Sequence, residues 1–122
     1  MNTRAANAYR KGDLESAPKH VVLERLFDRF ARDLSQAREA ITAKDIQKKA
    51  ALLDHALRIV GEFSAALDHA AAPELCANLA ALYQYVIERI GDANTKLEIA
   101  PLDEAVTLMG EIGDAFKAVH AR

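Results

Sequence analysis

The stretch Pro73-Glu-Leu-Cys-Ala-Asn-Leu-Ala-Ala-Leu-Tyr-Gln-Tyr-Val-Ile-Glu-Arg-Ile90 carries the strongest fold signal in this 122-residue chain. Its apolar residues recur at steps of three and four positions, the spacing that places side chains on one face of an α-helix. These residues are Leu75, Leu79, Leu82, Val86 and Ile90. Proline followed by glutamate is typical of a first helical turn, because proline lacks an N–H group that would have no partner there and the acid favours the positive helix end. The stretch predicts an amphipathic helix that begins at Pro73 and ends between Asp92 and Glu98.

Three further stripes with the same period surround this helix in the sequence, each with its own start or stop signal. The first begins at Ser16-Ala-Pro18, where a hydroxyl cap precedes a proline in the first turn. Thr42-Ala-Lys-Asp45 interrupts the pattern and separates the first stripe from the second. Pro101 opens the last stripe and is followed by two acidic residues. The apolar positions are Val22, Leu26, Phe30, Leu34, Ala37 and Ile41 in the first stripe, Ile46, Leu53, Leu57, Val60, Phe63 and Leu67 in the second, and Leu102, Val106, Met109, Ile112, Phe116 and Val119 in the last.

Four amphipathic segments joined by short connections predict an antiparallel up-and-down four-helix bundle. No stretch alternates with period two for long enough to indicate a strand. We therefore expect an all-α fold with two parts. Residues 1–15 form a mobile N-terminal arm or a short extra helix, and residues 16–122 form the bundle domain, which is long enough to have a core of its own.

The composition predicts a cytoplasmic protein that neither binds nucleic acid nor inserts into a membrane. The formal net charge is -2 and no block of Lys and Arg occurs, so a nucleic-acid footprint is missing. The N-terminus has no apolar core of a signal peptide, and no apolar run approaches the ~20 residues that cross a bilayer. The only cysteine, Cys76, has no partner for an internal disulfide and falls in a helical pattern as a small apolar residue.

Residue patterns of the common enzyme and metal sites are missing from the sequence. No glutamate is followed three positions later by a histidine, the pair that di-metal bundles place on one helix face. There is no Cys-x-x-Cys, no phosphate-binding loop and no Gly-x-Ser-x-Gly. The sequence thus predicts no metal ion, no cofactor and no enzymatic activity.

One segment, from Asp54 to Gly61, weakly resembles the phosphoacceptor segment of histidine phosphotransfer domains, which are also four-helix bundles. His55 lies opposite Ile46 and Leu57 on a helical wheel, so we expect it to be exposed. In that family a small residue stands four positions after the histidine, whereas Ile59 occupies this position and would crowd an incoming partner. A solvated histidine on a polar face is therefore favoured, and phosphotransfer through His55 is kept as the alternative function.

The apolar stripes of two helices are wider than a core alone requires. The apolar residues of the second helix spread over roughly 180°, and the last helix is nearly as wide, with Leu108 and Val119 on its margin. Either the bundle is small, Ala-rich and generously apolar, or part of the excess lines a groove for a partner's amphipathic helix. Tyr85 lies outside the core arc of its helix, which suits an interface. Gly110 and Gly113 either allow a neighbouring backbone to approach closely or leave the last helix loosely held.

The longest motif of the chain stands in the third helix. It reads Asn78-Leu79-Ala-Ala-Leu82-Tyr83-Gln-Tyr85-Val86-Ile-Glu-Arg89-Ile90, followed by Ala93-Asn94. Further along the chain, Asp114-Ala115 precedes the aromatic Phe116. Tyr9 stands a few residues before the Ser16-Ala-Pro18 helix start, and Leu26-Phe27-Asp28 follows on the first helix. In order and spacing these residues resemble the FliS family of flagellin export chaperones, over almost the whole chain from Tyr9 onward.

The resemblance implies a binding module and not an enzyme. Members of that family hold the disordered C-terminal segment of flagellin on a helical bundle, which prevents premature polymerisation, and deliver it to the flagellar export gate. Carried over position by position, it implies that Tyr9, Tyr83, Tyr85, Arg89 and Asn94 contact the client. Tyr83 also falls on the apolar arc and Asn94 near the helix end, so a core role and a helix-ending role stay open for them. A third interpretation is a bundle that only self-associates or docks another flagellar export component; the sequence does not give the oligomeric state.

Overall fold

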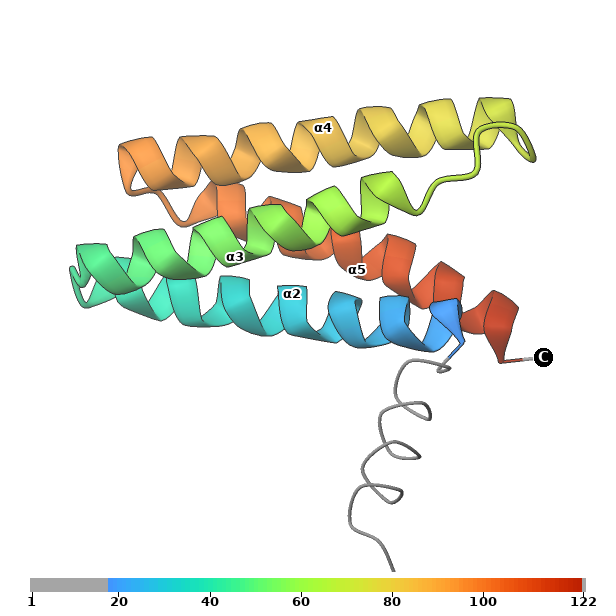
Figure 1. The fold of residues 1–122 in the computed structure, drawn as a ribbon. Helices are drawn as coiled ribbons and strands as arrows, with labels where there is room; N and C mark the ends of the chain where they lie inside the picture. Colours follow the sequence, from blue (N-terminus) through green and yellow to red (C-terminus); the bar gives the residue numbers. More distant parts are fainter. Residues whose placement is uncertain (1–17, 122) are drawn as a thin grey trace, which may run out of the picture.

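In the computed structural model, which describes residues 18–121, four long α-helices lie side by side (Figure 1). They are α2 (Lys19–Thr42), α3 (Ile46–Ala65), α4 (Pro73–Lys96) and α5 (Ala100–His120). Each helix packs against the next one in the chain, and α5 returns to pack against α2; within residues 18–121 the backbones of the diagonal pairs stay apart. The expected all-α, antiparallel up-and-down four-helix bundle is confirmed.

The helix ends lie where the start and stop signals predict them, with two exceptions. The first is α2, which begins at Lys19: Pro18 precedes the first turn instead of lying in it, and its carbonyl accepts hydrogen bonds from the N–H groups of that turn. The Asp45 carboxylate caps α3 by accepting from the Lys48 N–H at 3.1 Å. α4 begins at Pro73 and ends at Lys96, because Leu97 adopts the left-handed conformation with φ 55°. The second exception is Leu67, since α3 ends two residues before it at Ala65.

Aromatic side chains fill the part of the core nearest the start of α2. Phe27 of α2 stacks on Phe63 of α3 with ring centroids 4.2 Å apart, and Phe116 of α5 lies 5.8 Å from Phe27. Gly113 of α5 faces this cluster: a Cβ built on it would stand 3.0 Å from the Phe27 ring, whereas one on Gly110 would meet nothing within 4 Å. Close approach thus explains Gly113, although its neighbour is a side chain and not a backbone.

Most of the buried side chains form one continuous core along the bundle. Cys76 is buried as well, as expected of a small apolar residue in a helix. None of the helices in the described part of the chain is both long enough and apolar enough to cross a membrane. The largest fully buried side chains are Phe30, Leu34, Leu53, Ile90, Leu102, Met109, Val60 and Val86.

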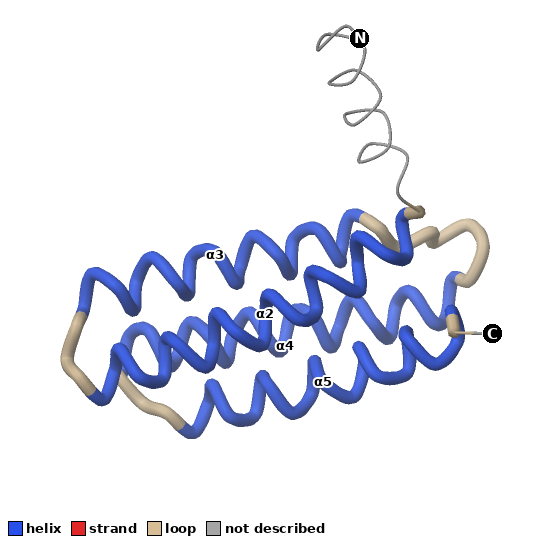
Figure 2. The backbone as a smooth tube through the Cα atoms, turned by 90° about the horizontal axis from the view of Figure 1, so that it is seen from below, coloured by secondary structure: helices blue, strands red, loops and turns tan. Residues whose placement is uncertain are grey.

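The start of α2 and the end of α5 lie at the same end of the bundle (Figure 2). There His20 and His120 stack with ring centroids 4.7 Å apart, and His120 also packs against Phe116. The connection between α3 and α4 lies at this end as well, whereas the α2–α3 and α4–α5 connections lie at the other (Figure 2).

Candidate functional site

A long apolar hollow, which we call the α4–α5 groove, runs along the outside of the seam between α4 and α5. It consists of two adjoining depressions of about 440 Å³ and 600 Å³ that share Leu82, Leu108 and Glu111. The larger depression lies toward the start of α5, and the smaller one toward its end. The lining residues are Leu75, Leu79, Leu82, Tyr83 and Tyr85 of α4, Asp103, Glu104, Thr107, Leu108, Glu111, Ile112, Ala115, Phe116, Val119 and His120 of α5, and Phe27 of α2.

The groove exists because apolar residues of α4 and α5 continue past the line where the two helices meet. Leu75 is 59% exposed and Val119 is 63% exposed, although both repeat at core spacing in the sequence. Leu79, Leu82 and Leu108 are half-buried, and Leu79 and Leu108 pack against the core from the groove side. The wide stripe of the last helix therefore lines an open surface.

The wide stripe of α3 has a different explanation. Leu52 and Leu57 on its margins are half-buried and pack against the core, while Ile46 in its first turn is 49% exposed and lines no part of the α4–α5 groove. Most of the width of this apolar stripe is therefore explained by packing against the core.

Tyr85 stands at the acidic end of the groove and links its two walls. Its side chain is 39% exposed, as its place outside the core arc predicts, and its hydroxyl donates a hydrogen bond to the Glu104 carboxylate of α5. This hydrogen bond is the main reason that the pKa of Tyr85 lies above its ordinary value. The guanidinium of Arg89 lies 5.5 Å from the centre of the Tyr85 ring and also pairs with Asp92. Tyr85 is therefore held at the surface by polar contacts on both sides.

Tyr83 lies on the opposite side of α4 and belongs to the core. It is buried, with its ring centroid 6.0 Å from that of Phe63, and burial raises the pKa of its hydroxyl. It also forms part of the floor of the groove. The two readings that the sequence leaves open for Tyr83 are therefore compatible.

Of the remaining predicted client contacts, Arg89 and Asn94 do not line the groove. Asn94 lies in the last turns of α4, where its carbonyl accepts a hydrogen bond of 3.0 Å from the buried Lys49 ammonium of α3. Arg89 flanks the groove only through Tyr85. Tyr9 lies outside the described residues. Tyr83 and Tyr85 thus line the two adjoining depressions of the groove, whereas Asn94 lies farther along α4, next to Lys49 of α3.

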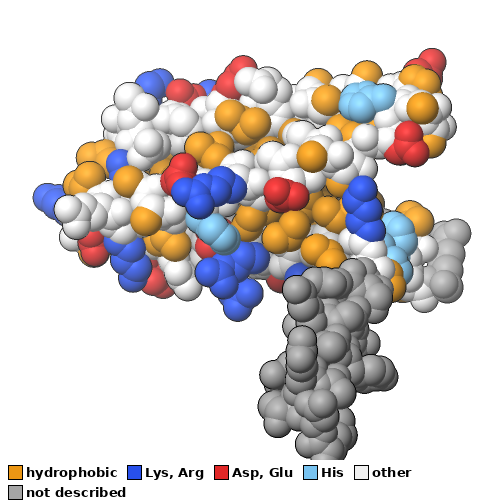
Figure 3. All heavy atoms as spheres, in the orientation of Figure 1, with side chains coloured by type: hydrophobic (Ala, Val, Ile, Leu, Met, Phe, Trp, Pro, Cys, Tyr) orange, Lys and Arg blue, Asp and Glu red, His pale blue; other side chains and the backbone are white. Residues whose placement is uncertain are grey.

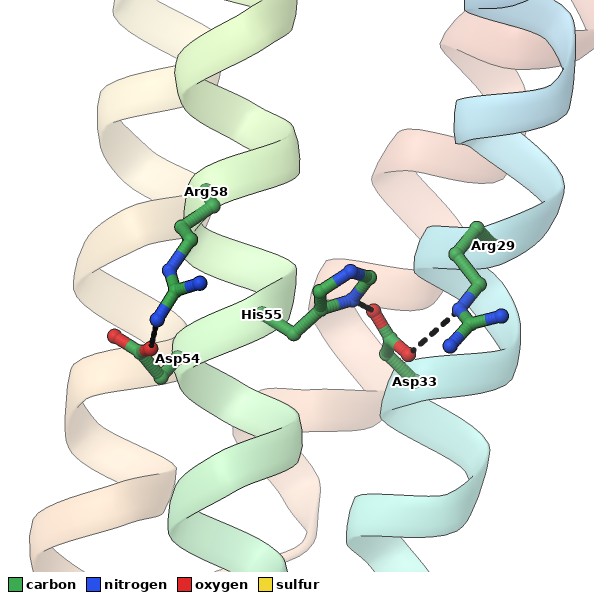
Figure 4. A network of polar contacts seen from close by, with 5 residues as sticks. All are labelled: Arg29, Asp33, Asp54, His55 and Arg58. Atoms are coloured by element: carbon green, nitrogen blue, oxygen red, sulfur yellow. Dashed lines mark hydrogen bonds and ion pairs between the residues drawn. The ribbon is translucent and has the colours of Figure 1, made fainter.

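His55 lies at the partly exposed seam between α2 and α3 (Figure 4). Its Nδ1 hydrogen-bonds the carboxylate of Asp33, which is buried and also lies 3.4 Å from the Arg29 Nε. On the outer side of α3, Arg58 pairs with Asp54 (Figure 4). The expected exposure of His55 agrees with the 44% of its side chain that is open to solvent, whereas its pairing with the buried Asp33 was not predicted.

The expectation that Ile59 crowds the approach to His55 is wrong. Ile59 is buried in the core, so it cannot stand beside an incoming partner. The physical reason is the rotation of α3: Ile59 faces inward, whereas Ile46, which the helical wheel counts as a core position, is exposed. Within residues 18–121 no group of three or more His, Cys, Asp or Glu side chains is arranged to hold a metal ion.

Sequence reasoning missed the acidic margin of the groove. Asp103, Glu104 and Glu111 line it, yet in the sequence the first two read only as favourable charges at a helix start. The signal that could have found them is their spacing, since Glu104, Leu108 and Glu111 follow one another at steps of four and three on one helix face.

The part of the chain described above is an all-α bundle with an open apolar groove. The comparison with protein families is more specific. The chain belongs to the family of the flagellar protein FliS, whose model matches residues 1–122. The family resemblance seen in the sequence is thereby confirmed.

Individual relatives agree with this assignment. The chain is 31% identical over 120 residues to the flagellar secretion chaperone FliSB of Pseudomonas aeruginosa, an alignment that covers 95% of each chain. It is also 31% identical over 108 residues to the flagellar secretion chaperone FliS of Salmonella typhimurium, covering 88% of this chain and 80% of that protein. The crystal structure of a flagellar chaperone from bacteria has the same fold, with a TM-score of 0.79, 17% identity, and coverage of 99% and 98% of the two chains.

Proposed function

We propose that this protein is a cytoplasmic export chaperone that binds the C-terminal segment of flagellin, keeps it from polymerising and delivers it to the flagellar export apparatus. Two observations support the proposal: the whole-length membership of the FliS family and the open apolar α4–α5 groove. The groove is the main support for the proposal, because an exposed apolar channel on an otherwise well-packed bundle needs an apolar partner.

The size of the groove suits one amphipathic helix. From Glu104 to Val119 it follows α5 over fifteen residue steps, which is about 22 Å at about 1.5 Å per residue. A client helix of about four turns lays its apolar stripe along Leu79, Leu82 and Leu108. The same stripe, once covered, is withheld from filament contacts.

The proposal requires binding and release, with no chemical step. Tyr85, and Tyr83 through the groove floor, are the family-motif residues best placed to contact the client. Client contacts by Tyr9, Arg89 and Asn94 stay predictions, and so does docking of the loaded chaperone to an export gate component.

Calorimetry with a peptide of the flagellin C-terminal segment tests this function. We expect binding near one to one, with a gain of helical circular dichroism signal as the peptide folds on the bundle. Absence of binding at tens of micromolar concentration contradicts the proposal.

A matched pair of variants tests the place of binding. Leu75→Ser removes an exposed leucine from the groove, and we expect it to weaken binding roughly three- to tenfold, because its contact with the client buries apolar area. Ile46→Ser removes a similarly exposed side chain from α3 and should leave the affinity unchanged. Equal effects of the two substitutions would place the client elsewhere.

A further inference from the structure

The charged residues that line the α4–α5 groove have one sign. Asp103, Glu104 and Glu111 line the depression at the start of α5, and no Lys or Arg among residues 18–121 lines either depression. At the other end the lining is mostly apolar, and its charged or titratable side chains, apart from the buried Tyr83, are His120 and the shared Glu111. The groove is therefore an apolar channel with an acidic margin on α5 that is concentrated toward one end.

Neighbouring cations compensate this margin only in part. Asp103 lies 3.4 Å from Arg38 of α2, with both side chains more than half exposed. Glu104 accepts a hydrogen bond from the neutral Tyr85 hydroxyl. Glu111 forms no ion pair with any residue of the described bundle. A negative potential therefore remains along the groove, and low salt preserves it.

The charge of the whole bundle is distributed unevenly in the same way. Residues 73–120, which include α4 and α5, carry eight acidic side chains and three Lys or Arg. Residues 19–65, which include α2 and α3, carry seven acidic side chains and nine Lys or Arg. Basic side chains accordingly gather over α2 and α3 in Figure 3. The groove lies in the acidic half.

We propose that the α4–α5 groove selects an amphipathic helix with Lys or Arg along the margin that faces α5, and binds it with its N-terminus at the Asp103–Glu104 end. Complementary charge at the margin fixes which side of the helix meets α5. The positive end of a helix dipole is its N-terminus, so the acidic end of the groove fixes the direction, parallel to α5. This inference rests on the proposed function and specifies the client chemistry of the same site.

A second copy of this chain fits the groove less well. The basic face over α2 and α3 has the complementary charge, but its exposed large apolar residues, Val22 and Ile46, lie at opposite ends of the bundle. That face therefore offers no continuous apolar stripe to fill the channel. A foreign amphipathic helix supplies both the charge and the stripe.

Two designed 18-residue peptides with the same Leu and Ala stripe, one with Lys and one with Glu along the margin, test the selection. We expect the Lys peptide to bind about tenfold more tightly at low salt, and the difference to shrink at high salt. Glu111→Lys combined with Glu104→Lys should reverse the order. Glu62→Lys, which changes an exposed acid on α3, is the control and should leave the order unchanged. Circular dichroism verifies that every variant is folded.

A nitroxide label on the N-terminus of the Lys peptide tests the direction. We expect it to broaden amide signals near Asp103 and Thr107, and a label on the peptide C-terminus to broaden those near Val119. The reverse pattern overturns the direction. Equal affinity of the two peptides overturns the selection, and so does a dimer, detected by light scattering, that the Glu111→Lys variant abolishes.

The flagellin segment itself separates this inference from the proposed function. If that segment binds with an affinity that Glu104→Lys and Glu111→Lys leave unchanged, the acidic margin has no role in client choice and the chaperone proposal stands. If neither the segment nor the Lys peptide binds, both are overturned.

Discussion

Among single residues, Gly113 has the tightest surroundings of the glycines on α5. Its missing Cβ leaves room for the Phe27 ring, which cannot retreat easily because Phe63 and Phe116 pack around it. Glycine at position 113 lowers the helix propensity but allows close aromatic packing. Gly110, one turn earlier, lowers the helix propensity without any such packing contact.

Alanine substitution at the two glycines should therefore have opposite effects. Gly110→Ala should raise the free energy of unfolding by up to about 1 kcal/mol, because alanine is the better helix former. Gly113→Ala should lower it by about 1 kcal/mol net, since overpacking against Phe27 outweighs that gain. Urea denaturation of both variants measures the difference. Stabilisation by Gly113→Ala would mean that the aromatic cluster adjusts freely.

Tyr85 offers a pH-dependent readout of the groove. Its pKa is raised because its hydroxyl donates to Glu104, so the stabilisation from this hydrogen bond is fully present below about pH 10 and is lost as the pH rises through the raised pKa. Glu104→Gln should lower the pKa of Tyr85 toward its ordinary value. Ultraviolet titration, with Tyr85→Phe as the reference for the other tyrosines, measures the change. An unaltered titration curve would show that Glu104 does not hold the hydroxyl in solution.

At the scale of helices, the contact between α2 and α3 includes a buried carboxylate. Asp33 lies inside the seam, and its partners His55 and Arg29 reach it from the partly exposed edge. A buried acid left without partners is costly, so this cluster favours one register of α3 against α2. His55 has a clear structural role in this arrangement.

A double-mutant cycle on Asp33→Asn and His55→Ala tests this role. We expect a coupling energy of about 0.5 to 3 kcal/mol, because the two side chains touch and share one hydrogen bond. Chemical denaturation of the two single variants and the double variant provides the values. The cycle Asp54→Asn with Arg58→Ala is the control: that pair is exposed and should couple by less than about 1 kcal/mol. Additive effects of Asp33 and His55 would exclude the register role.

Helices were the most predictable elements, and their faces were less so. The start of α4 at Pro73 and the break between helices before Ile46 follow from proline and capping chemistry, which acts within one turn of the chain. The rotation of each helix does not follow, because it depends on which neighbours it meets. Leu75 repeats at core spacing yet faces the groove, and Ile59 reads as crowding His55 yet is buried. The Glu104–Tyr85 contact joins two helices and has no signature in either one alone.

At the scale of the whole molecule, the bundle has one closed and one open side. The aromatic cluster and the Asp33 contact tie α2 to its neighbours, whereas α4 and α5 keep apolar residues at the surface. The unequal charge of the two halves adds to this difference. A client that approaches the molecule meets a surface with a preferred side before it makes any close contact.

The stacked His20 and His120 rings, described above as a contact between α2 and α5, have a consequence for chain connectivity. They bring the start of α2 and the end of α5 so close together that the order in which the helices are synthesised need not determine how they pack. A circular permutant that joins Arg122 to Met1 and opens the chain between His69 and Ala70 should fold with unchanged helical content, measured by circular dichroism, because no helix is cut. A permutant opened between Leu53 and Asp54, inside α3, should not fold. If the first permutant also fails to fold, the architecture depends on the α3–α4 connection and not on helix packing alone. The chain could then not begin at any of the four helices and still form the bundle.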